Sequence, residues 1–543
     1  MKKYLLFLLI ILAAGAIASC DLGSSDDSSD SSSTEGAFKI VNSWGAGVFD
    51  WENISDGHYW IEYEDMKTNG MYVWYFINDY DSDAYDPSAI AVFEVDHAVR
   101  DDVQITIGLR DNSDTTIMSK TFETDDVDGI PTGGALPFPD NPMVLDLGEF
   151  VDYLNDYDLF LTATNLGTTE GTIESFSLEL YNGYDSSGVY DYIYSYDGSE
   201  ILAGSTITMG SDGTDYSTVT MEIETSGNID SNWTGSSSIS STSSFVLSGG
   251  TSFTTRQMTS SEISDLVSKD SQNNPNAHNP DGLGTGWLAP TTEEWEKTSL
   301  LTGIENISSK SSSSSDDEVD LSATDYFPPI GNQGTEGSCV AFSTAYYMHT
   351  YMEAREHGWD LSDISWDDEA TTISDYGEPD SGQDMIFSPD YIYHQTNYGE
   401  DGGSAYIYAV ETIVRQGCAT WEAMPYNTED STTWPDEEAW RNAAQYRVDF
   451  ETHYDGESDY LMGFLVVDTD EEIEFLEYLL SEGYPLCTAI DGGSTTDYGL
   501  YDYLDENDVV ENGYTFTVDD LNHAQTIVGY KANDEWDSSN PED

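Results

Sequence analysis

The sequence predicts an α+β protein that carries an additional all-β sandwich domain. Between about Met71 and Tyr181, six or more short runs of alternating residues are separated by turn clusters, which is typical of an antiparallel sandwich. From Val319 to Tyr530 the pattern changes to mixed helical and strand periodicity. A chain of 543 residues has room for two to four such domains.

The charge balance excludes several classes of partner. The chain has 104 acidic residues against 16 basic ones, a formal net charge of −88. Such a surface repels phosphate backbones and anionic headgroups, so we expect no nucleic-acid partner. No lysine occurs between Lys310 and Lys531, and this composition favours a halophilic protein that is soluble in concentrated salt. An ordinary acidic secreted protein is the alternative.

The first residues indicate export. Residues 1–19 read as a signal peptide, with a charged start and an apolar run from Tyr4 to Ile17 that is too short to span a bilayer. The motif Ile17-Ala-Ser-Cys20 resembles the bacterial lipobox, which implies lipidation of Cys20, and residues 20–36 form a Ser/Asp-rich tether. We therefore expect an exported protein that is lipid-anchored on the periplasmic or cell-surface side of a bacterial membrane. A plain secretory signal with a chance cysteine is the alternative.

Three cysteines remain after the signal: Cys339, Cys418 and Cys487. They cannot all pair within the chain, so at least one thiol is free and is a candidate nucleophile. Whether Cys418 and Cys487 pair is left open.

Cys339 stands at the predicted start of a helix. A helical pattern follows Ser338 and closes at His357-Gly358. Ser338 is expected to cap this helix, and the helix terminus to lower the pKa of Cys339. A buried structural cysteine is the alternative for Cys339 taken alone.

The surrounding motif resembles that of the papain-like cysteine peptidases. The matching residues are Gln333-Gly334, Gly337-Ser338-Cys339 and Ala341-Phe342-Ser343. The resemblance implies a two-lobed domain with a helical lobe and a β-barrel lobe. It makes Cys339 the nucleophile and gives the Gln333 amide and the Cys339 N–H to the oxyanion hole. Val340 replaces the usual Trp, and Glu336 stands where many members have a disulfide cysteine.

Three further segments match in family order. Gly417-Cys418 followed by Met424-Pro425-Tyr426 resembles the family's Gly-(Ile/Val/Cys)…Tyr-Pro-Tyr stretch. Asp401-Gly402-Gly403-Ser404 resembles the segment whose backbone pairs with the substrate, and Leu521 to Tyr530 resembles the strand that carries the catalytic histidine, here His523. The separation between Cys339 and His523 exceeds the family's roughly 130–150 residues. A satisfied core histidine is the alternative for His523 alone.

The family's Asn-Ser-Trp-Gly motif stands at the other end of the chain, as Asn42-Ser-Trp44-Gly. A strand pattern at 56–61 follows it, as in the family. We interpret this order as a circular permutation in which residues 37–65 are the family's C-terminal hairpin. The resemblance implies that Asn42 orients His523 and that Trp44 shields their hydrogen bond from water.

These predictions divide the chain into a signal peptide, a tether, a permuted hairpin, a lectin-like sandwich, an unplaced β-rich and linker region, the main peptidase part and an acidic tail. Their bounds are 1–19, 20–36, 37–65, 66–181, 182–317, 318–530 and 531–543.

The predicted function is membrane-anchored cysteine peptidase activity on protein or peptide substrates, with no metal or organic cofactor. A non-catalytic surface adhesin or carbohydrate-binding lipoprotein on a papain-like scaffold is the first alternative, and an acyl or amide transferase is the second. By analogy the sandwich binds a glycan or another surface ligand. Asp79, Asp81 and Asp83 could hold Ca²⁺, although a solvated loop is favoured there.

Overall fold

A computed structural model describes residues 35–46, 56–76, 78, 80, 85–122, 134–182, 192–197, 207–209, 217–231, 233–235, 240–241, 246–247, 251–252, 254–269, 282–296, 298–302, 317–369, 376–448, 450–451, 462–517 and 520–541. The predicted signal peptide, the lipidation of Cys20 and the candidate Ca²⁺ ligands Asp79, Asp81 and Asp83 lie outside these residues and stay predictions. Among the described residues, no helix combines the length and the apolar character that crossing a membrane requires.

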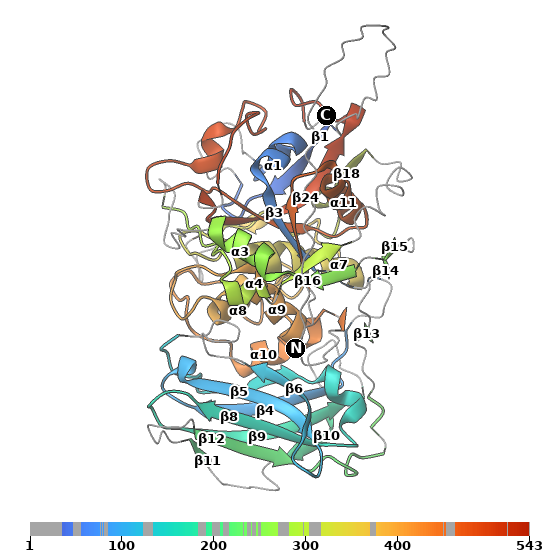
Figure 1. Cartoon of the computed structure of the whole chain (residues 1–543), viewed down its shortest axis with the longest axis vertical. Coiled ribbons are helices and arrows are strands. Elements are labelled where there is room, and N and C mark those ends of the chain that lie inside the picture. Colours follow the sequence, from blue (N-terminus) through green and yellow to red (C-terminus); the bar gives the residue numbers. More distant parts are fainter. Residues whose placement is uncertain are drawn as a thin grey trace, which may run out of the picture. The chain divides into compact units, whose positions relative to one another are not determined.

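A nine-stranded sheet carries His523 and includes the strand that ends just before Asn42 (Figure 1). Its order is β16 (Thr254–Gln257), β17 (Ser299–Thr302), β22 (Met462–Val467), β3 (Met71–Phe76), β23 (Leu486–Ile490), β24 (His523–Ala532), β1 (Gly36–Val41) and β2 (His58–Glu62), with β18 (Glu318–Asp320) also paired to β24.

The two ends of the chain meet within this sheet. β1 runs antiparallel to β24, from Gly36 opposite Ala532 to Val41 opposite Thr526, and β2 pairs with the other side of β1. Because Asn42 follows β1 directly and β24 begins at His523, this register brings together two residues that are 481 positions apart.

The helix of Cys339 packs against β24 of this sheet. The predicted helix after Ser338 forms as α6 (Cys339–Ala341), the π-type η5 (Phe342–His349) and α7 (Thr350–His357), and it ends as predicted at Gly358, whose φ is +66°. The others are α1 (Tyr63–Asn69), α3 (Ser260–Lys269), α4 (Thr292–Glu296), α8 (Pro389–Thr396), α9 (Tyr406–Gln416), α10 (Glu437–Ala443) and α11 (Asp470–Ser481).

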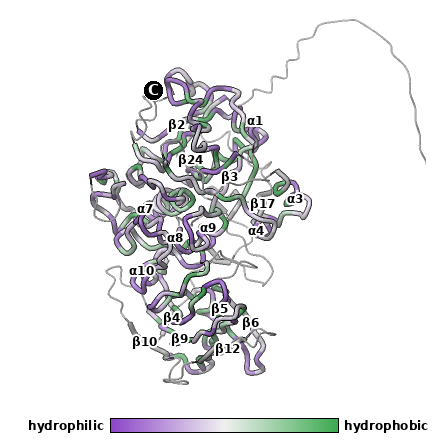
Figure 2. The backbone as a smooth tube through the Cα atoms, turned by 90° about the vertical axis from the view of Figure 1, so that its left-hand side faces the viewer, coloured by the Kyte–Doolittle hydropathy of each residue, from purple (hydrophilic) through white to green (hydrophobic). Residues whose placement is uncertain are grey.

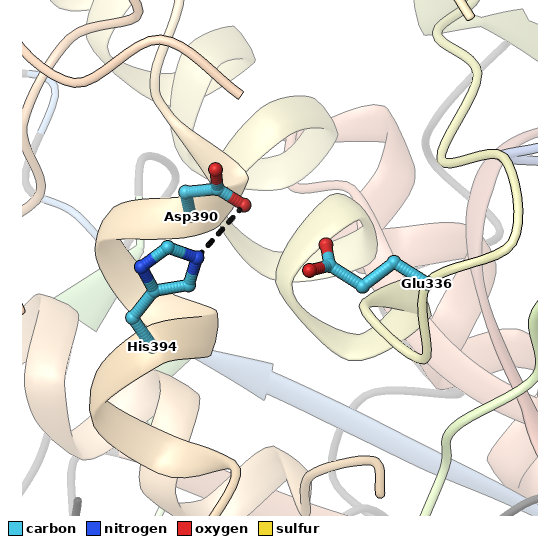
Figure 3. A group of neighbouring side chains, drawn as sticks. All are labelled: Glu336, Asp390 and His394. Atoms are coloured by element: carbon cyan, nitrogen blue, oxygen red, sulfur yellow. Dashed lines mark ion pairs between the residues drawn. The ribbon is translucent and has the colours of Figure 1, made fainter. Parts of the chain in front are cut away.

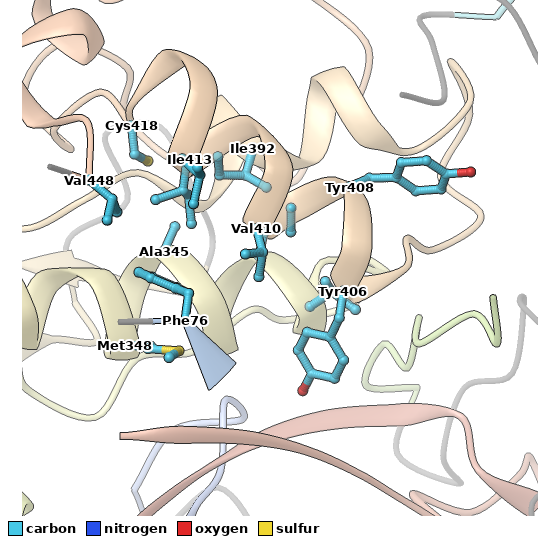
Figure 4. Close-up of a cluster of buried hydrophobic side chains, with 14 of the residues drawn as sticks. Phe76, Ala345, Met348, Ile392, Tyr406, Tyr408, Val410, Ile413, Cys418 and Val448 are labelled. Carbon is cyan, nitrogen blue, oxygen red and sulfur yellow. The ribbon is translucent and has the colours of Figure 1, made fainter. Parts of the chain in front are cut away.

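A buried apolar cluster fixes the helix of Cys339 (Figure 4). Val410 and Ile413 of α9 and Ile392 of α8 gather over Ala345 and Met348 of η5. Each is 2% exposed or less. Burying an aliphatic side chain of this size contributes about 1.5–3 kcal/mol, so this packing holds the helix firmly in place.

Two further sheets stack as a sandwich (Figure 1). One contains β10 (Tyr192–Asp197), β9 (Gly171–Tyr181), β4 (Ala89–Asp96), β7 (Met143–Asp146) and β11 (Ile207–Met209), and the other β12 (Ser217–Ile223), β8 (Asp158–Asn165), β5 (Val103–Arg110) and β6 (Thr116–Phe122). Apolar residues follow the strands and hydrophilic ones the connecting loops (Figure 2).

The predicted sandwich boundaries of 66 and 181 need correction at both ends. β3 (Met71–Phe76) belongs to the nine-stranded sheet, between β22 and β23. At the other end, β10, β11 and β12 extend the sandwich to Ile223, inside the region that the sequence left unplaced. The predicted acidic tail, 531–543, also needs a later start, because Lys531 and Ala532 still belong to β24.

The remaining elements are short. They are the strand pairs β13 (Ser240–Ser241) with β21 (Phe450–Glu451), β14 (Val246–Leu247) with β15 (Thr251–Ser252) and β19 (Trp366–Asp367) with β20 (Glu378–Pro379), and the 3₁₀ turns η1 (Arg100–Asp102), η2 (Gly148–Tyr153), η4 (Leu321–Ala323), η6 (Ala444–Tyr446), η7 (Gly499–Tyr503) and η9 (Asn533–Glu535). The fold therefore mixes helices and strands as predicted, whereas the division into a helical and a barrel lobe stays a prediction.

A buried ionic cluster joins the sandwich to the helical region. Arg447 pairs with Asp146 and with Glu149, and its Nε donates to the Val414 carbonyl at 2.7 Å. Lys120 Nζ donates to the Asp146 carbonyl at 3.0 Å. We call Arg447, Lys120, Asp146 and Glu149 the Arg447 cluster.

Candidate active site

Cys339 occupies the first position of α6, as predicted, but Ser338 does not cap the helix with its side chain. The Ser338 hydroxyl instead lies 2.6 Å from the Tyr426 hydroxyl, and only the Ser338 carbonyl enters the helix, accepting from the Phe342 N–H at 3.0 Å. The predicted cap is therefore wrong: the serine side chain holds the loop to a neighbouring segment.

The environment of the thiol differs from the prediction. Cys339 is completely buried, and its Sγ accepts from the Ala524 N–H at 3.3 Å. Burial raises the pKa of the thiol to about 12, although the N–H groups of Ala524, Val340 and Gly286 act in the opposite direction. The predicted lowering of the pKa is thus wrong for this state, because loss of water outweighs the helix terminus.

His523 is the first residue of β24 and directly precedes Ala524, whose N–H contacts this sulfur. Its Nε2 is 3.3 Å from Asn42 Oδ1, and its ring stacks on that of Trp44 with centroids 4.2 Å apart and planes 19° apart. His523 Nδ1 has no hydrogen-bond partner. Burial lowers the pKa of the imidazole to about 3, so the ring is neutral.

The contacts of Asn42 decide the tautomer of this neutral ring. Asn42 Oδ1 accepts from the Ser43 N–H at 2.7 Å and from Gln525 Nε2 at 3.2 Å, so the atom facing His523 is an acceptor. His523 Nε2 must then carry the hydrogen, which leaves a lone pair on Nδ1. The ring therefore presents a base on the side that Asn42 does not occupy.

Backbone bonds attach the Asn42 motif to the loop before Cys339. Gln333 N–H donates to the Ser43 carbonyl at 2.8 Å, and Gly45 N–H donates to the Gly331 carbonyl at 2.9 Å. The Ser43 hydroxyl also donates to Gln333 Oε1 at 2.5 Å. Two segments that are distant in sequence thus form one rigid frame.

Gln333 is present in the site, but its amide hydrogens are engaged. Gln333 Nε2 donates to the Gly284 carbonyl at 2.9 Å and to the Glu336 carbonyl at 2.7 Å. The side chain is completely buried. An oxyanion could use this donor only after Gly284 has moved away.

Gly284 belongs to a segment that sequence reasoning missed, residues 282–288, which we call the covering segment. Its Gly284 carbonyl also accepts from Trp44 Nε1 at 2.9 Å. The N–H groups of Gly286 and Trp287 both donate to the Asn522 carbonyl at 2.9 Å. The covering segment therefore lies directly over Cys339, Gln333 and His523.

The same segment pairs with the predicted substrate-binding backbone. Ser404 N–H donates to the Gly286 carbonyl at 2.8 Å, and Leu288 N–H donates to the Ser404 carbonyl at 2.9 Å. A Cβ on Gly403 would lie 2.4 Å from the Gly286 carbonyl oxygen. A Cβ on Gly402 would instead have the Glu400 side chain, at 3.7 Å, as its nearest neighbour. Gly403 thus meets another backbone as predicted, but that backbone is the chain's own.

Alternate glycines make this approach possible. A Cβ would lie 2.0 Å from the Glu336 carbonyl oxygen if added at Gly284, and 1.9 Å from that of Gly337 if added at Gly286. These distances exclude any side chain. The Gly-Leu-Gly-Thr-Gly pattern of 282–286 was the available sequence signal, since glycine in an extended stretch often marks close backbone approach.

The other two cysteines lie away from the site. Cys418 and Cys487 are buried and, like Cys339, are free thiols in the described chain. Cys487 Sγ contacts Met348 Sδ at 3.5 Å, and Cys418 Sγ lies 3.6 Å from the Ser388 carbonyl. Both are core residues.

Comparison with known proteins gives a limited result. No family model matches the chain, and no curated protein matches it. One similar solved structure is that of Xylellain, a cysteine protease from Xylella fastidiosa, at 14% identity, 48% coverage of this chain, 82% of the other and a TM-score of 0.29. A second comes from work on antibody cross-reactivity between the mite allergens Blo t 1 and Der p 1, at 17% identity, 50% and 68% coverage and a TM-score of 0.23. At these scores the likeness carries no functional conclusion, which has to come from the side chains.

Proposed function

We propose that the chain is an exported, membrane-anchored cysteine peptidase that hydrolyses peptide bonds with Cys339, His523 and Asn42. One observation carries the proposal: Asn42 Oδ1 lies 3.3 Å from His523 Nε2 beneath a stacked Trp44, while the residue after His523 contacts Cys339 Sγ. A structural histidine needs no partnerless ring nitrogen, but a general base does.

The same observation supports a circular permutation. Residues 37–65 contribute β1 to the sheet that contains His523, and Asn42 follows β1 immediately. In this proposal the hairpin has moved to the front of the chain, while its place beside β24 is unchanged.

The proposed reaction uses each residue in turn. His523 Nδ1 takes the proton of the Cys339 thiol, and the thiolate attacks the peptide carbonyl carbon. The Cys339 N–H and Gln333 Nε2 stabilise the oxyanion, and His523 then protonates the leaving amine. Water, deprotonated by the same ring, hydrolyses the thioester and releases the acid. Asn42 keeps the ring in the required tautomer throughout.

The covering segment must leave before this chemistry can begin. It holds the Gln333 amide through Gly284 and occupies the Gly403–Ser404 backbone through Gly286. In its presence Cys339 and His523 are both neutral, so the described arrangement is a resting state. Displacement of residues 282–288 would admit water and substrate together.

The direct test is labelling with an epoxysuccinyl probe, followed by peptide mapping. We expect label on Cys339 once the covering segment is displaced, and none in Cys339→Ala, which should also lose peptide hydrolysis. Cys418→Ala and Cys487→Ala are matched controls that should keep both. Absence of label and of hydrolysis in the wild type and in a displaced variant would overturn the proposal in favour of the non-catalytic adhesin.

The role of Asn42 can be tested separately. Asn42→Ala should keep the fold and lower kcat with little change in KM, because the ring loses its orienting acceptor. Unchanged kcat would remove Asn42 from the mechanism while leaving Cys339 in it.

A further inference from the structure

A group of three buried titratable residues lies outside the proposed reaction. Glu336 stands in the loop three positions before Cys339, and Asp390 and His394 lie one turn apart on α8. Figure 3 shows the Glu336 carboxylate pointing from its loop toward the two α8 side chains. One ligand atom from each residue lies within 4.8 Å of the other two. The residues are 1%, 1% and 3% exposed.

The atoms that face one another have no hydrogen-bond partners. Both Glu336 oxygens, Asp390 Oδ1 and His394 Nε2 lack a partner with hydrogen-bond geometry. The hydroxyls of Tyr426 and Ser338 lie near Glu336 and interact with its carboxyl. Even so, four polar atoms at one buried point are unusual, because buried polar groups are almost always paired.

The outward-facing atoms of the same residues are fully used. His394 Nδ1 lies 2.5 Å from the Thr433 carbonyl, which can only accept, so Nδ1 carries a hydrogen. Asp390 Oδ2 accepts from the Asn427 N–H at 2.7 Å. These outer bonds orient the imidazole Nε2 and the second carboxylate oxygen toward Glu336, as outer partners do around metal ligands.

Within the cluster the His394 imidazole is the only group that can carry positive charge, and its Nε2 lies 3.5 Å from Asp390 Oδ1. Among the described residues no lysine or arginine pairs with Glu336, Asp390 or His394, and a further carboxylate, Asp401, accepts from the neighbouring Gly337 N–H at 2.8 Å. One imidazole cannot balance two buried carboxylates, and burying an anion without a positive partner is costly. A divalent cation would supply the missing charge at the point where the lone pairs converge.

We propose that Glu336, Asp390 and His394 bind a divalent transition-metal ion, Zn²⁺ or Mn²⁺, that ties the loop before Cys339 to helix α8. Two carboxylates and one imidazole are ligands that these ions accept. Ca²⁺ prefers six to eight oxygens, and Mg²⁺ keeps several waters, so a buried site with three protein ligands suits them less.

The ion has a positioning role. The Glu336 carbonyl accepts from Gln333 Nε2 at 2.7 Å, so fixing the Glu336 side chain also fixes the loop that presents this donor. Cys339 Sγ accepts a hydrogen bond from the Ala524 N–H, and the proposed ion acts on the loop before Cys339 rather than on the sulfur. Metal binding is therefore expected whether or not the chain hydrolyses peptides.

The test uses the full chain, stripped with a chelator and then titrated separately with Zn²⁺, Mn²⁺, Ca²⁺ and Mg²⁺. About 1 M NaCl suppresses non-specific binding to the acidic surface. We expect one Zn²⁺ or Mn²⁺ per chain by elemental analysis and a higher melting temperature. Glu336→Gln and His394→Gln should each weaken binding by at least about a hundredfold. Glu438→Gln, an exposed acidic position on α10, is the matched control and should bind like the wild type.

The outcomes separate cleanly. Equal metal content in the wild type and in Glu336→Gln, or a wild-type melting temperature that Zn²⁺ and Mn²⁺ leave unchanged, would overturn the proposal and make Glu336 a buried protonated acid. If Glu336→Gln does not fold, the metal dependence of the wild-type melting temperature decides. Loss of peptidase labelling alone would affect only the proposed function.

Discussion

The Arg447 cluster and the Cys339–His523 pair are both buried, yet the groups of the first are charged and those of the second are neutral. Burial would raise the pKa of Glu149, but Arg447 and Lys120 hold it well below its ordinary value. Burial lowers the pKa of Lys120 only to about 8. Cys339 and His523 have no such partners, and their pKa values move to about 12 and about 3, toward neutrality. Burial removes a charge unless an opposite charge is buried with it.

Glu336, Asp390 and His394 form the informative third case. Like the Arg447 cluster they contain two buried carboxylates, but in place of an arginine and a lysine they have a single imidazole, paired with Asp390 at 3.5 Å. Burial raises the pKa of Glu336 well above its ordinary value, and Asp390 and Asp401 raise it further. The contrast with Glu149, which has cations beside it, is what makes a bound cation the natural complement there.

The largest expected effect comes from removing the compensating cation. Arg447→Met should cost about 3–5 kcal/mol of unfolding free energy, because Asp146 loses its buried ion pair and Glu149 keeps only Lys120 as a cationic partner. Urea unfolding measures this. Arg110→Met removes the half-buried pair with Glu222 at 2.7 Å and should cost at most about 1 kcal/mol. Equal losses in the two variants would break the comparison.

The second prediction concerns the entry of water to the candidate active site. Gly286→Val should displace the covering segment, because the valine Cβ would lie 1.9 Å from the Gly337 carbonyl oxygen. Displacement of the covering segment should lower the pKa of Cys339 and speed its alkylation by iodoacetamide near pH 8 by at least about a hundredfold.

Gly282→Asn is the control for this experiment. Gly282 has a φ of +81° and no neighbour within 4 Å of an added Cβ, and asparagine tolerates that conformation. Its alkylation rate should match the wild type. A slow Gly286→Val would show that something other than the covering segment keeps the thiol neutral.

The pH dependence of stability should reveal His523. Its pKa is about 3 in the folded state and about 6.5 when unfolded, so the neutral ring stabilises the fold above about pH 6.5, and this stabilisation is lost as the pH falls toward 3. Between pH 7 and pH 5 the wild type should lose about 2 kcal/mol more unfolding free energy than His523→Gln. Parallel curves for the two proteins would contradict a neutral buried imidazole.

The smallest expected effect is that of salt, which screens charges on the surface but not buried ones. The Debye length falls from about 10 Å at 0.1 M salt to about 3 Å at 1 M, so NaCl should raise the melting temperature by a few degrees by screening a net charge of −88. The cost of Arg447→Met should not change, because that cluster is buried. A melting temperature that stays flat or falls would remove the halophilic interpretation.

The sequence revealed those parts of the site whose signal lies in side chains. Asn42, Cys339 and His523 were identified from motifs, and their elements form where the patterns predicted. β3 was misassigned although its signal was present: Met71–Phe76 is buried at every position and apolar throughout, whereas β5 alternates as a sandwich strand does. The continuous run indicated a central strand with both faces covered.

The covering segment explains the remaining errors. It acts through backbone atoms, and Gly284 and Gly286 contribute no side chain that a motif could contain. The predicted pKa of Cys339 used only the local helix terminus and could not include burial by a segment more than fifty positions away in the chain. The local N–H groups do lower the pKa of Cys339, but burial by the rest of the fold raises it by more.

The pairing of β1 with β24 has a consequence for the proposed anchoring: it limits how far the candidate active site can lie from a membrane that holds Cys20. With Cys20 lipidated, as we propose, only the stretch from Cys20 to Gly36 separates the bilayer from the strand that ends at Asn42. A fully extended chain spans about 3.3–3.6 Å per residue, which gives this stretch a reach of less than about 60 Å. With the hairpin at the far end of the chain, the tether would instead lead first into the sandwich. In the present order a lipidated Cys20 would keep the start of β1, which leads to Asn42, within this reach of the lipid surface, and distance from the membrane would then limit which proteins the proposed peptidase can cleave.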